Sequence, residues 1–69
     1  MSNWFAVHKQ TKLIVKIIAS SSKPKDSKDA IFFLATDKAL DTYYKHFKPN
    51  APLLDIGFMM NKHPYLMPK

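Results

Sequence analysis

The sequence predicts a small α+β domain: a three-stranded antiparallel meander packed on one main helix, with a short C-terminal helix or strand. Three β-prone apolar segments follow one another, separated by polar turns or loops. The next segment, residues 37–47, has the 3.6-residue apolar period of an amphipathic helix. Sequential strands with short connections usually pair with their neighbours, so we expect a meander with the helix on one face.

The length of 69 residues is typical of a single domain spanning residues 1–69. We expect residues 1–3 and 63–69 to be extended tails. The 46% apolar content is that of a folded chain. The sequence has no cysteine, no apolar run long enough to span a bilayer and no signal-peptide pattern, so we expect an intracellular, cytoplasmic protein without a membrane partner.

The first two strands are expected at residues 4–8 and 13–19. The polar residues 9–12 between them predict a hairpin turn, although the Asn-Gly or Asp-Gly pair typical of such turns is missing. Strict alternation in the second strand predicts two sets of side chains. One face would carry Leu13, Val15, Ile17 and Ala19, and the other face would carry Ile14, Lys16 and Ile18.

A loop and a third strand follow. Residues 20–29 are rich in Ser and Lys and contain Pro24, which is typical of a mobile loop. Residues 30–35 are expected to form the third strand. Alternation there separates the pair Ile31/Phe33 from the pair Phe32/Leu34.

The main helix is predicted at residues 37–47. Thr36 and Asp37 suit its start because short oxygen-bearing side chains accept hydrogen bonds from the first turn. Lys45 and Lys48 suit the negative end of the helix dipole, and Pro49 stops the helix. The expected apolar stripe consists of Leu40, Tyr43, Tyr44 and Phe47.

Residues 53–62 fit either a helix or a strand. Pro52 suits the first position of a helix, but Gly57 disfavours helix by about 1 kcal/mol relative to alanine. The same residues also alternate in apolarity, as a strand would. The prolines after residue 63 favour an extended tail.

The second and third strands are apolar on both faces, whereas one helix covers only one face. The other face would show Ile14, Ile18 and one of the two pairs of the third strand. Large apolar patches are rarely left in water, so we expect a cover. The alternatives are residues 53–67 folding back, a second copy of the chain in a homo-oligomer, or a different partner.

The charges point to an acidic partner. All eleven cationic side chains are Lys and all five acids are Asp, for a formal net charge of +6. Such a balance favours acidic proteins or phosphates, but lysine lacks the bidentate geometry with which arginine recognises guanine or a carboxylate. Alternatively, the lysines simply solvate a small protein.

No motif in the sequence requires a particular chemistry. His8, His46 and His63 lack metal-ligand spacing, and Asp37 and Asp41 are better explained as a first-turn acid and as the partner of Lys45. Ser20, Ser21 and Ser22 have no nucleophile motif around them, and no glycine-rich phosphate loop exists. We therefore expect no enzyme activity, no cofactor and no metal.

The favoured hypothesis is a non-enzymatic binding module for an acidic protein surface. Its size and composition are typical of the small accessory proteins that phages encode to bind or inhibit a host enzyme. The charged contacts would come from the hairpin and loop, and the apolar contacts from the second strand and the methionine-rich C-terminal segment that ends with Met67. The candidate partner-binding residues are Ile14, Lys16, Ile18, Lys9, Lys12, Lys23, Lys25, Lys28, Met59, Met60 and Tyr65.

The alternative hypothesis is a nucleic-acid-binding protein of weak sequence specificity that uses the lysine-rich hairpin and loop. Trp4 or Phe5 would then stack on a base, although both are more readily explained as core residues. The predicted strand–strand–strand–helix order is similar to that of plant-type and integrase-type three-stranded DNA-binding modules. The arginines and tryptophans with which those modules read DNA are missing here.

Overall fold

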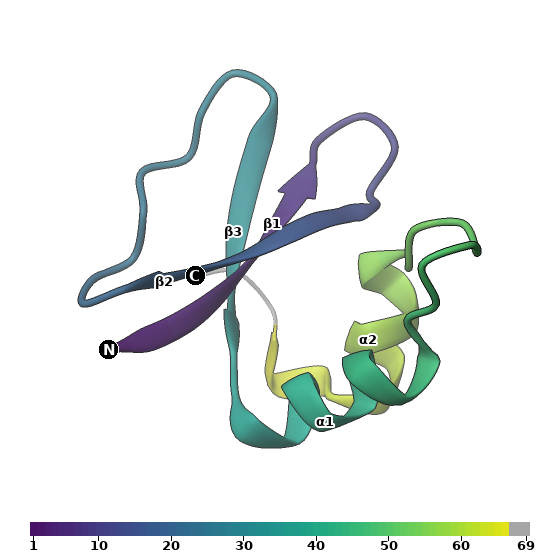
Figure 1. Cartoon of the computed structure of the whole chain (residues 1–69). Helices are drawn as coiled ribbons and strands as arrows, with labels where there is room; N and C mark the ends of the chain where they lie inside the picture. The colour runs from purple at the N-terminus through teal and green to yellow at the C-terminus, as the bar shows by residue number, and fades with distance from the viewer. Residues whose placement is uncertain (67–69) are drawn as a thin grey trace.

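The computed structural model describes residues 1–66, so Met67 lies outside the described part. It confirms the α+β class, with a three-stranded antiparallel sheet and one main helix (Figure 1). None of the helices in residues 1–66 combines the length and the apolarity needed to cross a membrane. In chain order the elements are β1 (Ser2–His8), β2 (Ile14–Ser20), β3 (Ala30–Ala35), α1 (Asp37–His46), α2 (Ile56–Lys62) and the 3-10 turn η1 (Pro64–Leu66).

The strand order is β2-β1-β3, which differs from the predicted meander. β1 pairs antiparallel with both neighbours and occupies the centre. Phe5, Ala6 and Val7 make it the most buried strand, so the central position suits its sequence. The long loop of residues 21–29 lets β3 reach the free edge of β1 instead of the edge of β2. The similarity to three-stranded DNA-binding modules assumed a meander and does not extend to this sheet.

The hairpin turn between β1 and β2 lies at residues 9–12, as predicted. The His8 imidazole replaces the missing Asn-Gly signal, because its Nδ1 accepts hydrogen bonds from the N–H groups of Gln10 (3.2 Å) and Thr11 (3.4 Å). Lys12 supplies the left-handed residue, with φ of 64°. The Lys12 N–H closes the turn on the His8 carbonyl at 2.8 Å.

A β-bulge in β2 overturns the strict alternation predicted for that strand. Ala6 pairs with Lys16, but Val7 pairs with Ile14, which leaves Val15 as the extra residue. Ile14 and Ile17 therefore share one face, while Lys16 and Ile18 share the other. The bulge turns Ile14 into the core, where it is fully buried.

Helix α1 begins as predicted, because the Thr36 Oγ1 accepts a hydrogen bond from the Ala39 N–H at 3.2 Å. Its predicted stripe was wrong at Tyr44, which is 63% exposed. The helix turns Ala39 and Tyr43 toward the sheet, and the Tyr43 ring stacks on Phe47 with centroids 5.3 Å apart. Burial raises the pKa of Tyr43 above its ordinary value of 10.0, and the neighbouring Tyr44 adds to the rise.

The C-terminal segment forms a helix, so the helical alternative for residues 53–62 was correct. Helix α2 begins at Ile56, later than Pro52, because the Asp55 carboxylate caps the Gly57 N–H at 2.6 Å. An isolated antiparallel bridge joins Asp55 to Leu13. This bridge ties the start of α2 to the edge of β2.

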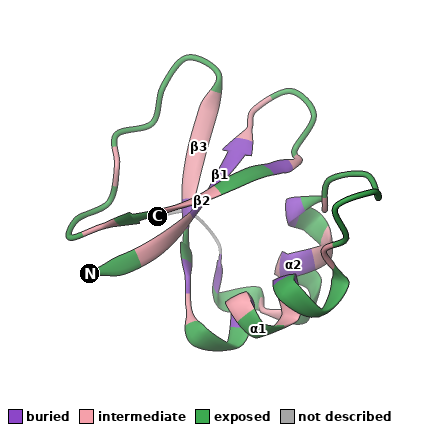
Figure 2. Cartoon of the chain, viewed as in Figure 1, coloured by how far each residue is buried: buried purple, intermediate pink, exposed green. Residues whose placement is uncertain are grey.

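Both helices lie on the same side of the sheet, while the β2–β3 loop arches away from them (Figure 1). The buried positions concentrate in β1, the start of β2 and the inner sides of the helices (Figure 2). The residues after 63 also join this side: instead of an extended tail, Pro64–Leu66 forms η1, with Leu66 buried. The core consists of Phe5, Val7, Ile14, Phe33, Ala35, Ala39, Tyr43, Ile56, Met59 and Leu66.

At the N-terminus, Ser2 and Asn3 belong to β1 and not to a tail. The predicted mobile loop corresponds to the irregular residues 21–29, although Ser20 ends β2.

Candidate binding surface

The sheet face opposite the helices carries a second set of apolar side chains. Residues paired directly across antiparallel strands share a face, so the pairing of Trp4 with both Ile18 and Leu34 places these three on one face. Ala6 with its partners Lys16 and Phe32 lies on the same face. We call this surface the open face and define it by Trp4, Ala6, Lys16, Ile18, Phe32 and Leu34, with Val15 of the bulge beside it.

Much of the apolar area of the open face is accessible. Leu34 and Val15 are each 44% exposed, and Trp4, Ile18 and Phe32 are half-buried. None of these five belongs to the core or to the residues packed against it. One alternative expected residues 53–67 to fold back over this face. That expectation was wrong for residues 53–66, because α2 and η1 pack on the core side.

One hydrogen bond and one buried residue shape the open face. Trp4 Nε1 donates to the Ser20 carbonyl at 3.4 Å, which holds the indole near the end of β2. Ala6 has only 1% of its surface exposed, so larger neighbours bury this small residue at the centre of the sheet. The face therefore offers a fixed aromatic side chain at one end and aliphatic side chains beside it.

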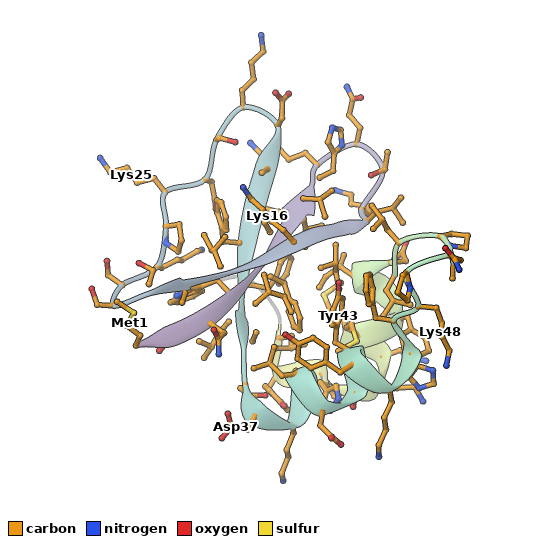
Figure 3. The ribbon with its side chains drawn as sticks, in the orientation of Figure 1. Met1, Lys16, Lys25, Asp37, Tyr43 and Lys48 are labelled. Atoms are coloured by element: carbon orange, nitrogen blue, oxygen red, sulfur yellow. The ribbon has the colours of Figure 1, made fainter. Side chains whose placement is uncertain are left out.

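One lysine lies on the open face, and three more lie in the loop that follows β2. Lys16 is exposed on the open face itself, between Val15 and Ile17 in the chain. The exposed Lys23, Lys25 and Lys28 lie in the loop that connects β2 to β3. Figure 3 shows Lys16 and Lys25 on the side of the ribbon away from Tyr43 and Lys48, which lie with the helices. Apolar and positive surface therefore occur together on the side without helices.

The other two lysine candidates lie apart from this surface in the hairpin turn. Lys12 is exposed and Lys9 is partly buried. The Lys9 N–H donates to the Asp29 carbonyl at 2.8 Å, so the hairpin turn and the end of the β2–β3 loop lie side by side. The structure thus brings the turn lysines close to the loop that carries Lys28.

Four predicted partner-binding residues belong to the core or hold elements against it. Ile14 and Met59 are fully buried in the core, so neither contacts a partner in this fold. Met60 is half-buried and packs against the core. Tyr65 is 54% exposed, but its hydroxyl forms a 2.7 Å hydrogen bond with the Thr36 Oγ1 and holds η1 against the start of α1. The C-terminal segment is therefore a structural part of the core side.

The predicted partner-binding residues did not include Trp4, Val15, Phe32 and Leu34, although the nucleic-acid alternative named Trp4 as a residue that would stack on a base. Alternation had grouped Phe32 with Leu34, but only the register with β1 shows that this pair shares a face with Ile18. Trp4 was interpreted as a core residue, whereas it is half-buried on the open face. Phe5, interpreted in the same way, is fully buried, which confirms that prediction.

Each of the three histidines contacts neighbouring residues of the fold. His8 closes the hairpin turn, and the His46 ring lies edge-on to Phe58 with centroids 5.0 Å apart. His63 Nε2 and Thr42 Oγ1 are 2.9 Å apart. Within residues 1–66, no three His, Asp or Glu side chains gather where they could hold a metal ion.

Asp37 and Asp41 occupy the helix positions that the sequence predicted for them. Asp41 forms the predicted i, i+4 ion pair with Lys45 at 3.4 Å, on a surface where both side chains are about 70% exposed. Asp37 lies in the first turn of α1.

Comparison of the chain with protein-family models, with curated proteins and with solved structures finds no match.

Proposed function

We propose that the protein is a non-enzymatic binding module whose open face docks on an acidic protein surface. The observation that supports this proposal most strongly is the apolar open face, which includes Lys16 and lies on the side of the sheet opposite α1 and α2. Small domains rarely leave contiguous apolar side chains in water unless those side chains contact a partner.

The charge pattern supports an acidic partner. The chain has a formal net charge of +6, and Lys16 sits among apolar neighbours, where a partner's carboxylate would be partly desolvated on docking. The lysines of the β2–β3 loop would add attraction at longer range and speed the encounter. Apolar contact would supply most of the affinity, and the lysines would supply orientation and rate.

The experiment compares two variants that place the same charge at two exposed apolar residues. Leu34→Glu changes the open face, and Tyr44→Glu changes the outer side of α1; the wild-type side chains are 44% and 63% exposed. Proteins captured from an extract by the immobilised wild-type chain are identified, purified and titrated against all three forms. We expect an acidic protein that loses about tenfold or more in affinity for Leu34→Glu and about twofold or less for Tyr44→Glu.

Equal losses for both variants would contradict the proposal, as would a captured protein that is indifferent to both. Circular dichroism of each variant checks that it is folded, so that a loss of binding is not mistaken for unfolding.

The second candidate function is nucleic-acid binding. The observation that favours it is the shared placement of Trp4, Phe32 and Lys16 on the open face. Aromatic rings on a sheet surface stack on bases, and lysines contact phosphates. Titration of a single-stranded and a double-stranded oligonucleotide at low salt tests it. Binding that weakens linearly on a log–log plot against salt would support this function, and no binding at low salt would eliminate it.

A further inference from the structure

The two edges of the sheet differ in how far the chain itself occupies them. On the outer edge of β3, the Phe32 N–H donates to Asp26 Oδ1 at 3.3 Å. On the same edge, the Ala30 carbonyl accepts from the Ser27 N–H at 2.9 Å. The β2–β3 loop therefore covers part of this edge and hinders an incoming strand.

Within residues 1–66, the outer edge of β2 is occupied only at its start. The Ile14 N–H donates to the Leu54 carbonyl, and the Ile56 N–H donates to the Lys12 carbonyl, both at 2.8 Å. This short segment runs antiparallel to β2 through the Leu13–Asp55 bridge. Continued in register it would bring Pro52 near Lys16, but proline has no N–H to donate. The start of this edge therefore pairs with an antiparallel segment, and within residues 1–66 this pairing ends after one bridge.

The ladder shows which groups of β2 point outward. The His8 N–H donates to the Leu13 carbonyl, toward β2. The bonding direction alternates along a strand, so Ala6 and Trp4, two and four residues before His8, also bond toward β2. Their partners Lys16 and Ile18 bond inward. The backbone N–H and C=O groups of Ile17 and Ala19 therefore point away from β1, and neither residue has another hydrogen-bond partner among residues 1–66.

We propose that the outer edge of β2 at residues 16–20 adds an extended, acidic strand of a partner protein, antiparallel to β2. This inference rests on the proposed function, because the added strand belongs to the acidic partner. Its backbone would bond to Ile17 and Ala19, and its alternate side chains would extend the open face beside Lys16 and Ile18.

The side chains of β2 define the sequence that the strand would carry. Opposite Lys16 and Ile18 the new pairs are of the non-hydrogen-bonded type, in which side chains approach most closely. A carboxylate fits opposite Lys16 and an apolar side chain fits opposite Ile18. In the antiparallel direction, the partner strand therefore reads apolar, any residue, acidic.

The charges on this edge disfavour a second copy of the chain as the occupant. Each copy carries a formal net charge of +6, so two copies repel each other. The β2 edge also offers Lys16 and no acidic side chain between residues 14 and 20. A lysine on an edge strand discourages pairing between identical edges, whereas it attracts an acidic strand.

The test uses the full chain and a displayed library of random linear peptides. We expect selection to enrich peptides with the apolar–any–acidic pattern. A synthetic copy of an enriched peptide is then titrated against the wild type, Ala19→Pro and the control Ala19→Thr. Ala19 is exposed and its N–H points outward, so proline removes an edge donor without removing a bond to β1.

We expect Ala19→Pro to weaken peptide binding about tenfold or more and Ala19→Thr to weaken it about twofold or less. A second measurement keeps the test decisive if Ala19→Pro does not fold. In the wild type, peptide binding should slow amide hydrogen exchange at Ile17 and Ala19 selectively.

Four outcomes would overturn the inference: no enrichment of the pattern, equal binding to Ala19→Pro and Ala19→Thr, unchanged exchange at Ile17 and Ala19, or a dimer of the free chain that Ala19→Pro dissociates. Binding that Leu34→Glu abolishes and Ala19→Pro leaves intact would also overturn strand addition, but it would leave the proposed function standing.

Discussion

The two faces of the sheet have similar side chains and different surroundings. The helix side carries Phe5, Val7 and Phe33 beneath α1, α2 and η1, all at most 4% exposed. The open face carries Trp4, Ile18, Phe32 and Leu34, and within residues 1–66 none of these packs against the core. Apolar residues alone therefore do not define the core of this domain. What defines it is which face receives the three C-terminal elements.

The sharpest comparison between the faces uses the neighbours Phe33 and Phe32. Phe33 is 4% exposed in the core, whereas Phe32 is half-buried on the open face. We predict that Phe33→Ala lowers the free energy of unfolding by about 3–5 kcal/mol, because it leaves a cavity among packed side chains. Phe32→Ala should cost about 1 kcal/mol or less, the scale of a cross-strand pair.

Urea unfolding followed by far-UV circular dichroism measures both variants. A chain of this size has little stability in reserve, so Phe33→Ala is expected to be largely unfolded without urea. Equal losses for the two variants would show that both faces are packed alike.

A second pair tests the bulge that separates Ile14 from Ile18. Strict alternation would place both on one face, whereas the bulge buries Ile14 and leaves Ile18 on the open face. We predict a loss of about 2–4 kcal/mol for Ile14→Ala and about 1 kcal/mol for Ile18→Ala, measured by the same unfolding method. The reverse order would mean that the bulge is wrongly placed.

The smallest change in the free energy of unfolding is expected from substitutions of the neighbours Tyr43 and Tyr44. This change should appear only at high pH. Because the pKa of Tyr43 is raised in the folded state, its contribution to stability is intact below the ordinary value of 10.0 and is lost as the pH rises above it. The unfolded chain ionises this tyrosine first, which favours unfolding. Tyr43→Phe should therefore flatten the decline of the unfolding free energy above pH 10.0, whereas the exposed-site control Tyr44→Phe should change it less.

Titration of thermal stability across that pH range measures the difference between the two variants. Identical slopes for Tyr43→Phe and the wild type would contradict the burial of the Tyr43 ring.

The sequence predicted the elements well where local signals agreed. The bounds of β3 match the prediction, and Thr36 caps α1 as its side chain suggested. Residues 53–62 were ambiguous because their apolar residues fit both periods. The decisive signal was Asp55, a good helix cap placed directly before Ile56.

The errors have one physical source, since each depends on contacts between distant parts of the chain. The central position of β1 depends on which edge β3 reaches across a long loop. One extra residue in β2 reversed the face of Ile14, which removed it from the candidate surface. Met59 looked like an adaptable surface residue until α2 packed on the same side as α1. By contrast, Lys16 and Ile18 were correctly expected to share a face because they lie beyond the bulge.

The most direct test of the uncovered face is the accessibility of its methyl groups in the full-length chain. NMR spectra of methyl-labelled protein, recorded at low concentration with a soluble paramagnetic agent, report this for each residue. We predict strong broadening of the Val15, Ile18 and Leu34 methyls and little broadening of the Val7, Ile14 and Ile56 methyls. Equal protection of the two groups in a monomer would show that the chain covers its own second face, and the proposal of a docking surface would then be wrong.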